Sequence, residues 1–158
     1  MNATRAVAAG LIGTATMTAL LLIEPSVGLP NIAIGQILST ALGLASAHLS
    51  SGPAIGWCIH FGVGVAFALV YAGVFARRLP GGPFVRGVLY GGLIFVLAQL
   101  VFMPLVGGGV FYRGDTEMIA GSLLGHLVYG GVVGWIYSLQ SASGPSSGGR
   151  AQYGTNAG

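Results

Sequence analysis

Four long apolar runs constrain the fold of this chain more than any other feature. They cover residues 6–23, 54–75, 87–106 and 118–139, and a helix needs about 20 apolar residues to cross a bilayer. A helix satisfies its own backbone hydrogen bonds in lipid, and none of the runs alternates with the period of a barrel strand. The sequence therefore predicts an all-α fold, a four-helix transmembrane bundle within residues 1–140.

The charged residues agree with a membrane protein and give it an orientation. Only 6% of the residues are charged, against roughly a quarter in soluble domains. Five of the six basic residues share one side of the predicted bundle, namely Arg5, Arg77, Arg78, Arg86 and Arg150. Basic loops stay in the cytoplasm, so both termini are predicted to be cytoplasmic, in a bacterial inner membrane. This topology accounts for the net charge of +3, and no nucleic-acid partner is expected.

Two segments lie outside the spans. Residues 31–48 have apolar positions at helical spacing and end before Ser50-Ser51-Gly52-Pro53, which predicts an interfacial helix in the first outer loop. Residues 141–158 are rich in Ser and Gly and are predicted to form a disordered cytoplasmic tail.

The chain contains an apparent internal duplication. Gly13, Pro25 and Gly28 recur at equal spacing as Gly92, Pro104 and Gly107, and the region around His60 recurs around His126. Two helical hairpins joined in tandem explain this pattern, and they insert with the same orientation because each contains two spans.

The two histidines head equivalent patterns of small residues. His60 is followed by Gly64 and Ala68, and His126 by Gly130 and Gly134. Small residues at this spacing predict a helix-packing seam. Ionisable groups inside a membrane are costly and usually face the bundle interior, so both imidazoles are predicted to point inward, at a depth where they can face each other.

Two readings of the histidines stay open. The favoured one is packing, in which each neutral imidazole bonds to a neighbouring polar group, with Glu24, His48 and Gln99 as candidate partners. The other is a haem b held by His60 and His126 as axial ligands. No metal site is predicted, because the chain has no HxxxH or CxxC spacing. No catalytic residue is predicted either, since nucleophile and phosphate-loop motifs are absent.

The segment His126–Gly130 and the element formed by Pro25 and Gly28-Leu29-Pro30 resemble those of an uncharacterised bacterial family of small four-span membrane proteins. The resemblance implies a small companion of a larger membrane complex, including respiratory oxidases, and carries no established catalytic residues.

The leading functional expectation is therefore a non-catalytic accessory or assembly subunit of a bacterial, respiratory membrane complex, with the bilayer and other subunits or further copies of this chain as partners. The alternatives are a haem b electron carrier using His60 and His126, and a small transporter or proton-conducting element.

Overall fold

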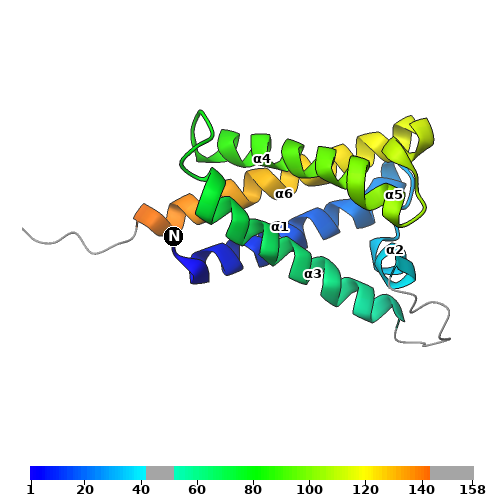
Figure 1. Cartoon of the computed structure of the whole chain (residues 1–158), viewed down its shortest axis with the longest axis horizontal. Helices are drawn as coiled ribbons and strands as arrows, with labels where there is room; N and C mark the ends of the chain where they lie inside the picture. Colours follow the sequence, from blue (N-terminus) through cyan, green and yellow to red (C-terminus); the bar gives the residue numbers. More distant parts are fainter. Residues whose placement is uncertain (42–51, 143–158) are drawn as a thin grey trace, which may run out of the picture.

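The computed structural model describes residues 1–41 and 52–142, and every regular element within these residues is helical (Figure 1). The four main helices are α1 (Ala3–Ile23), α3 (Gly52–Val70), α4 (Pro83–Leu97) and α6 (Thr116–Ala142). With their short extensions they form four segments long and apolar enough to cross a membrane: Ala3–Val27, Ala54–Phe75, Pro83–Leu105 and Thr116–Leu139. The predicted all-α, multi-pass bundle is thereby confirmed.

Side chains and a proline start the helices. The Asn2 side chain accepts a hydrogen bond from the Arg5 backbone N–H (3.1 Å) at the start of α1, and Asp115 accepts one from Met118 N–H (3.1 Å) at the start of α6. Such caps satisfy donors that have no partner within the helix. Pro83 occupies the first turn of α4, where its missing N–H costs nothing.

Three of the membrane segments end in a different helical form. A 3-10 turn, η1 (Glu24–Val27), extends α1, and a π-helical turn, η3 (Tyr71–Phe75), extends α3. A second π-helical turn, η4 (Ala98–Phe102), joins α4 to the short α5 (Met103–Leu105). The loop that follows contains another 3-10 turn, η5 (Val110–Gly114).

The helices pack around α1 and α6. The most extensive packing is between α4 and α6, and α1 packs against both α6 and α3. The side chains of Tyr71 and Phe75 contact Tyr90 of α4, with ring centroids 5.2 and 5.0 Å apart. These contacts hold η3 to α4 at one end of the bundle, whereas α3 and α4 are separate at the other end (Figure 1).

Glycines allow the closest helix contacts. A side chain at Gly87 of α4 would collide with the Gly130 carbonyl of α6, and one at Gly64 of α3 would collide with Thr14 of α1. Ala68 and Gly134 lie in the same two contacts, against Gly10 and Gly87 respectively. The small residues after His60 therefore pack α3 against α1, and those after His126 pack α6 against α4, so each contact lies within one hairpin.

The two predicted repeats end in the same way. Pro25 lies in the turn after α1 and Pro104 in the turn after α4, and a glycine three residues later takes a left-handed conformation in each case. The φ angles are 88° at Gly28 and 82° at Gly107. Glycine adopts this conformation at little cost, so the paired glycines terminate equivalent helices.

The described part of the first outer loop contains one helix, within the range predicted for the interfacial helix. Helix α2 (Ile34–Ala41) packs on α3, with the Gly35 carbonyl against Gly56. Residues 42–51, including His48, lie outside the described residues, as does the predicted tail from residue 143.

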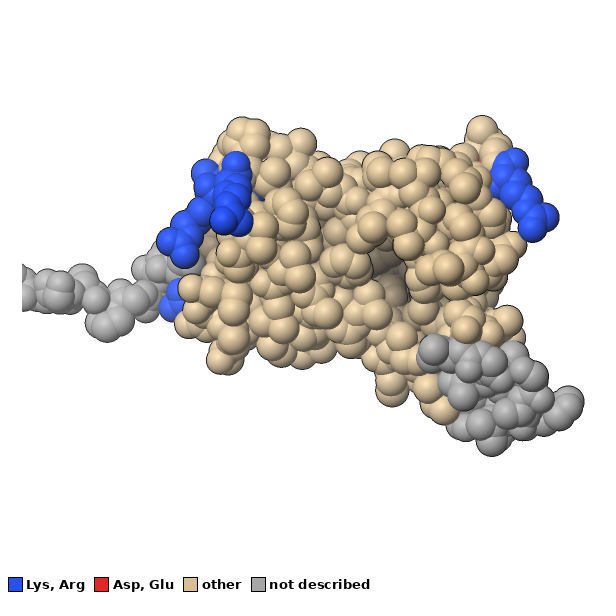
Figure 2. Space-filling view, viewed as in Figure 1, with Lys and Arg blue, Asp and Glu red and all other residues tan. Residues whose placement is uncertain are grey.

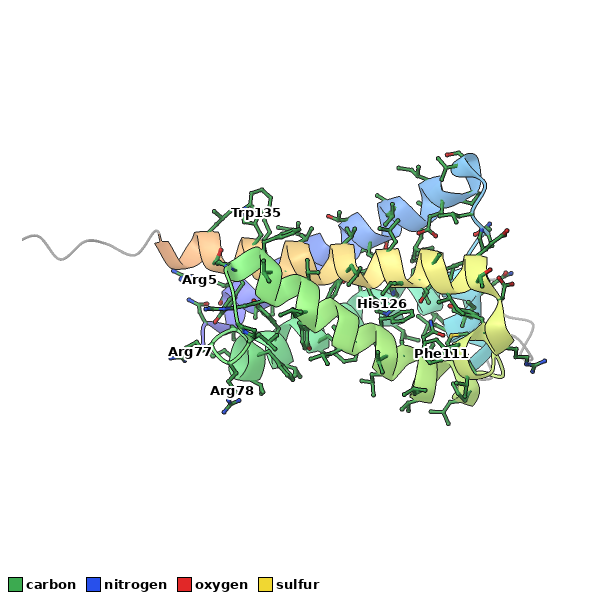
Figure 3. The ribbon with its side chains drawn as sticks, turned by 90° about the horizontal axis from the view of Figure 1, so that it is seen from above. Arg5, Arg77, Arg78, Phe111, His126 and Trp135 are labelled. Carbon is green, nitrogen blue, oxygen red and sulfur yellow. The ribbon has the colours of Figure 1, made fainter. Side chains whose placement is uncertain are left out.

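The charged side chains mark the two ends of the bundle (Figure 2). Arg5, Arg77 and Arg78 lie together at one end, with Phe111 at the opposite end and His126 between them (Figure 3). The first is called the arginine-rich end. The other is called the acidic end, because Glu24, Asp115 and Glu117 lie at the ends of helices there.

Candidate functional site

A cavity of about 380 Å³ lies between α3 and α4 in the half of the bundle toward the acidic end. It is visible as a hollow in the face of the molecule (Figure 2). Its walls come from six parts of the chain. The first hairpin and its loop contribute Met17 and Leu21 of α1, Ile34 and Leu38 of α2, and His60, Val63 and Phe67 of α3. The second contributes part of the stretch 94–105, which runs from α4 through η4 to α5, together with Tyr112 of η5 and Ser122, His126 and Tyr129 of α6. Ligand pockets in proteins have this size and a similar apolar lining.

Two tyrosines bond to α3 at the end of the cavity nearer the arginine-rich end. Tyr129 of α6 donates a hydrogen bond to the Gly64 carbonyl of α3, and Tyr90 of α4 donates one to the Phe67 carbonyl (2.7 Å). These bonds tie α3 to the second hairpin at the level of Gly64 and Phe67. Beyond this level α3 and α4 diverge, which leaves the cavity between them.

Four of the five residues of the π-helical turn η4 line the cavity. Ala98, Gln99, Val101 and Phe102 all contribute to the wall. A π-helical turn inserts an extra residue into a helix and changes the direction of the side chains that follow, and such turns are frequent at functional sites.

The cavity opens sideways between α3 and α4. Val63 of α3 and Leu97, Val101 and Leu105 of the opposite wall line it, yet each is exposed on the bundle surface. Because these residues belong to membrane-spanning segments, the mouth faces the apolar interior of the bilayer.

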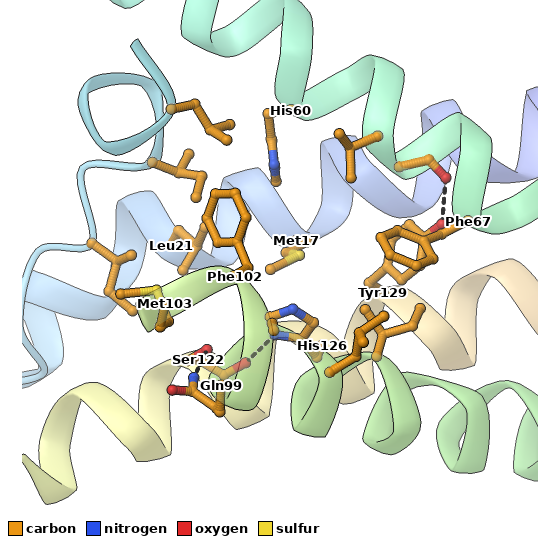
Figure 4. Close-up of a pocket in the computed structure, with 18 of the residues that line it drawn as sticks. Met17, Leu21, His60, Phe67, Gln99, Phe102, Met103, Ser122, His126 and Tyr129 are labelled. Carbon is orange, nitrogen blue, oxygen red and sulfur yellow. Dashed lines mark hydrogen bonds between the residues drawn. The ribbon is translucent and has the colours of Figure 1, made fainter. Parts of the chain in front are cut away.

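His60 and His126 reach the cavity from different walls, α3 and α6 (Figure 4). The His60 ring packs edge-on against Trp57 and Phe61, with centroids 5.8 and 6.0 Å away. Its Nε2 atom is buried and has no hydrogen-bond partner in residues 1–41 and 52–142. An unpartnered buried polar atom is uncommon in folded proteins, so His60 presents unused hydrogen-bonding capacity.

His126 has one nitrogen paired and one available. Its Nδ1 lies 2.7 Å from the Ser122 carbonyl, and since a carbonyl oxygen only accepts, Nδ1 of the neutral ring must carry the proton. The lone pair is then on Nε2, which is left to accept a hydrogen bond or bind a metal. Such a bond to the second nitrogen is the usual way in which a protein fixes an imidazole.

Gln99 extends this arrangement toward the acidic end. Its Nε2 donates to Ser122 Oγ (3.0 Å), and its Oε1 is buried with no partner among the described residues. Tyr112 lies beside both residues. Burial raises the pKa of the Tyr112 phenol, while the adjacent Ser122 and Gln99 side chains lower it and the charge of Glu24 raises it. A polar cluster of Gln99, Tyr112, Ser122 and His126 therefore occupies one side of an otherwise apolar cavity.

Glu24 is the acidic group nearest this cluster. Its side chain is 1% exposed, and neither carboxyl oxygen has a hydrogen-bond partner among the residues that the structure describes. The carboxyl lies against Gly121 of α6, the residue before Ser122. Burying a carboxylate without a partner costs several kcal/mol, on the order of the penalty for a desolvated ion, so this position is not explained by packing alone.

The structure brings together most of the residues predicted from the sequence. His60, His126 and Gln99 line one cavity, and Gly64 lies in its wall, whereas Ala68, Gly130 and Gly134 serve helix packing. Glu24 adjoins the cavity without bonding to either histidine, and His48 lies outside the described residues. Gln99 reaches His126 only through Ser122.

Sequence reasoning missed Ser122, Tyr129 and Tyr112. Ser122 precedes His126 by one helical turn and Tyr129 follows it by nearly one, so the helical spacing held a signal for both. Tyr112 gave none, because its position depends on an irregular turn in which Phe111, Tyr112 and Arg113 all have positive φ.

Residues 1–146 match a family model described as "Family of unknown function (DUF6789)". The chain belongs to this family. The predicted kinship with an uncharacterised family is thereby confirmed, while a bacterial origin and a link to respiratory oxidases stay predictions. No curated protein and no solved structure matches the chain. Membership of DUF6789 assigns no chemistry to the cavity, so its function must be argued from the residues themselves.

The donor set fits a haem only in part. The two imidazoles, with one nitrogen of His126 fixed by Ser122, are suitable axial ligands. However, no Arg or Lys is among the described residues that line the cavity, so nothing there compensates the carboxylates of a haem. The described part of the chain also has no group of three His, Cys, Asp or Glu residues placed to hold a metal ion.

Proposed function

We propose that this protein binds an amphiphile taken from the bilayer, with the apolar body of the ligand in the cavity and its head group at the polar cluster. The observation that carries the proposal is an apolar cavity of about 380 Å³ in which polar atoms of His60 and Gln99 are buried without a partner in the described part of the chain. Leaving such a group unpaired costs roughly 1–3 kcal/mol, and a ligand that supplies the missing hydrogen bonds removes that cost.

The lateral mouth supports this choice of ligand. The mouth, which Val63, Leu97 and Val101 line, faces the acyl chains of the bilayer rather than water. A molecule already dissolved in the membrane reaches the site without crossing a polar surface. Binding of this kind is also the first step of the transporter alternative, but movement across the membrane is not part of the proposal.

A pair of matched substitutions on α3 tests the proposal. Val63 is 43% exposed and lines the cavity, whereas Val70 is 46% exposed and does not. Val63→Trp should obstruct the mouth and reduce the amount of amphiphile that stays bound after purification, while Val70→Trp should leave it unchanged. Native mass spectrometry of the protein released from detergent measures both. Equal retention by the two variants would contradict the proposal.

An accessory role in a larger complex is the second candidate. Cys58, Gly62 and Ala66 lie on an exposed side of α3, and the space beside Gly62 is open. Small residues on a lipid-facing helix permit close approach of another helix. Purification from native membrane tests the role through co-purified subunits of a respiratory complex. Because Cys58 is the single cysteine, a disulfide-linked dimer would instead indicate contact between two copies of this chain.

Haem b is the alternative occupant of the same cavity, favoured by the available Nε2 of His126. A Soret band in protein purified from haem-replete cells, lost in His126→Ala, is the expected signature. A spectrum without that band would exclude this alternative and leave the binding of another amphiphile untouched.

The proposed location is the cytoplasmic membrane of a bacterium, with the arginine-rich end on the cytoplasmic side. The clustering of Arg5, Arg77 and Arg78 supports this orientation through the preference of basic segments for the cytoplasm. A fluorescent protein fused to the C-terminus should then fluoresce in the cytoplasm, and alkaline phosphatase fused there should be inactive.

A further inference from the structure

We propose that the cavity prefers an amphiphile with a protonated amine as its head group, and that Glu24 sets this preference. The inference rests on the proposed function, because it names the class of ligand that the same site takes.

The polar groups around the cavity include acceptors available to a ligand. His126 contributes the lone pair of Nε2, and Glu24 contributes two carboxyl oxygens that have no partner among the described residues. The basic residue at this end, Arg113, is exposed and donates to the Gly107 carbonyl (3.2 Å). A head group that brings several N–H donors matches this set, and a carboxylate or phosphate, which only accepts, does not.

Glu24 lies where its charge acts on the cavity. As the first residue of η1, it follows Met17 and Leu21 of α1 at helical spacing, and both of those residues line the cavity wall. Its carboxyl lies against Gly121, and its charge acts on Tyr112, which is itself in the wall. In a low-dielectric interior, opposite charges attract far more strongly than in water.

The unpaired carboxyl of Glu24 and a protonated amine head group are therefore complementary. A buried carboxylate is stabilised when it is paired and hydrogen-bonded, and an alkylammonium supplies both a positive charge and three donors. An anionic head group in the same place would face the Glu24 charge with no cation to offset it.

A panel of three ligands with the same alkyl chain tests the preference on the unaltered protein. Dodecylamine, 1-dodecanol and laurate differ only in having a cationic, neutral or anionic head. Native mass spectrometry of the full chain in detergent measures their binding. The amine should bind on the order of tenfold to a hundredfold more tightly than the alcohol, the range expected for a charge-assisted hydrogen bond, and laurate should bind least.

Two glutamate variants identify the residue responsible. Glu24→Gln keeps the shape and removes the charge, so the advantage of dodecylamine over 1-dodecanol should disappear while 1-dodecanol still binds. Glu117→Gln removes an exposed acidic residue near the start of α6 and should leave the advantage intact. Retained 1-dodecanol binding shows that a variant is folded, and the panel on the unaltered protein decides the preference even if Glu24→Gln is not recovered.

The outcomes separate the inference from the function on which it rests. Failure of all three ligands to bind contradicts the proposed function. Binding in which laurate equals or exceeds dodecylamine, or an unchanged preference in Glu24→Gln, overturns the inference alone. Enrichment of co-purified phosphatidylethanolamine would identify the amine as a phospholipid head group, whereas dodecylamine binding without such enrichment would indicate a free lipophilic amine.

Discussion

Two tyrosine hydroxyls join the hairpins at neighbouring carbonyls of α3. Tyr129 bonds to Gly64 and Tyr90 to Phe67, so one turn of α3 is held by both helices of the second hairpin. Both side chains are buried, at 4% and 2% exposure. A hydroxyl buried between membrane helices needs a partner. These two bonds therefore stabilise the packing of the hairpins and also hold the part of α3 that borders the cavity.

Tyr129→Phe should destabilise the protein by about 0.6–1.7 kcal/mol, the range measured for hydrogen bonds between membrane helices, because it removes the bond to Gly64 and keeps the ring. Unfolding of the protein in mild detergent measures the change. Thr16→Val is the matched control, since the Thr16 hydroxyl is exposed and bonds only to Ile12 within α1. A loss of stability no greater than that of the control would mean that the bond does not tie the hairpins.

The sequence identifies the histidines but not their partners. His60 and His126 stand out as ionisable groups within apolar runs, and the linear sequence alone shows this. The bond from Gln99 to Ser122 and the unpaired state of Glu24 depend on how helices cross, and a periodic pattern does not contain that information. The bond between His126 and Ser122 lies within one helix, and for that reason helical spacing alone could have suggested it.

Among the elements, the glycine-lined contacts decide how closely two helices approach. Gly87 and Gly130 place the backbones of α4 and α6 in direct contact, and Gly62 of α3 has open space around it. Glycine therefore permits a close helix contact at Gly87 but meets no described neighbour at Gly62, because only Gly87 lies on a side of its helix that packs against another helix.

Gly87→Ala should destabilise the bundle by roughly 1–3 kcal/mol, the usual cost of adding a methyl group to a packed interior, because backbone atoms of Gly130 cannot move aside as a side chain can. Gly62→Ala should be neutral or stabilising by up to about 1 kcal/mol, since alanine favours a helix more than glycine does. Thermal denaturation in detergent compares the two. A similar stability for both variants would contradict the assigned contact.

The regular helices follow from the sequence, and the interruptions do not. Apolar length and the caps at Asn2 and Asp115 indicate where helices run. The π-helical turn η4 contains no proline or glycine, and η3 contains only Gly73, one of many glycines in these helices. The contribution of α2 to the cavity wall has no signal in the sequence either. These features arise from contacts between elements.

For the whole molecule, the packing within and between the two hairpins explains the hollow. Each hairpin packs internally through its own small residues, and α1 joins the two by packing on α6. The helices α3 and α4 lie on the outer sides of this pair and meet only at the arginine-rich end, so the space between them at the acidic end stays open. Four spans were predictable from apolar length, but the cavity depends on the angle between hairpins.

If the hairpins are separately packed units, the chain should tolerate a break between them. Co-expression of residues 1–80 and 81–158 should give two fragments that co-purify through a tag on one of them, because the contact of α1 with α6 needs no covalent link. Gly13→Ile should weaken this recovery, since a side chain there would meet Val133 and the Tyr129 backbone. Ala15→Ile, on the exposed side of α1, should leave it unchanged. Fragments that insert but never associate would show that the loop at the arginine-rich end, and not the contact between α1 and α6, holds the two halves together.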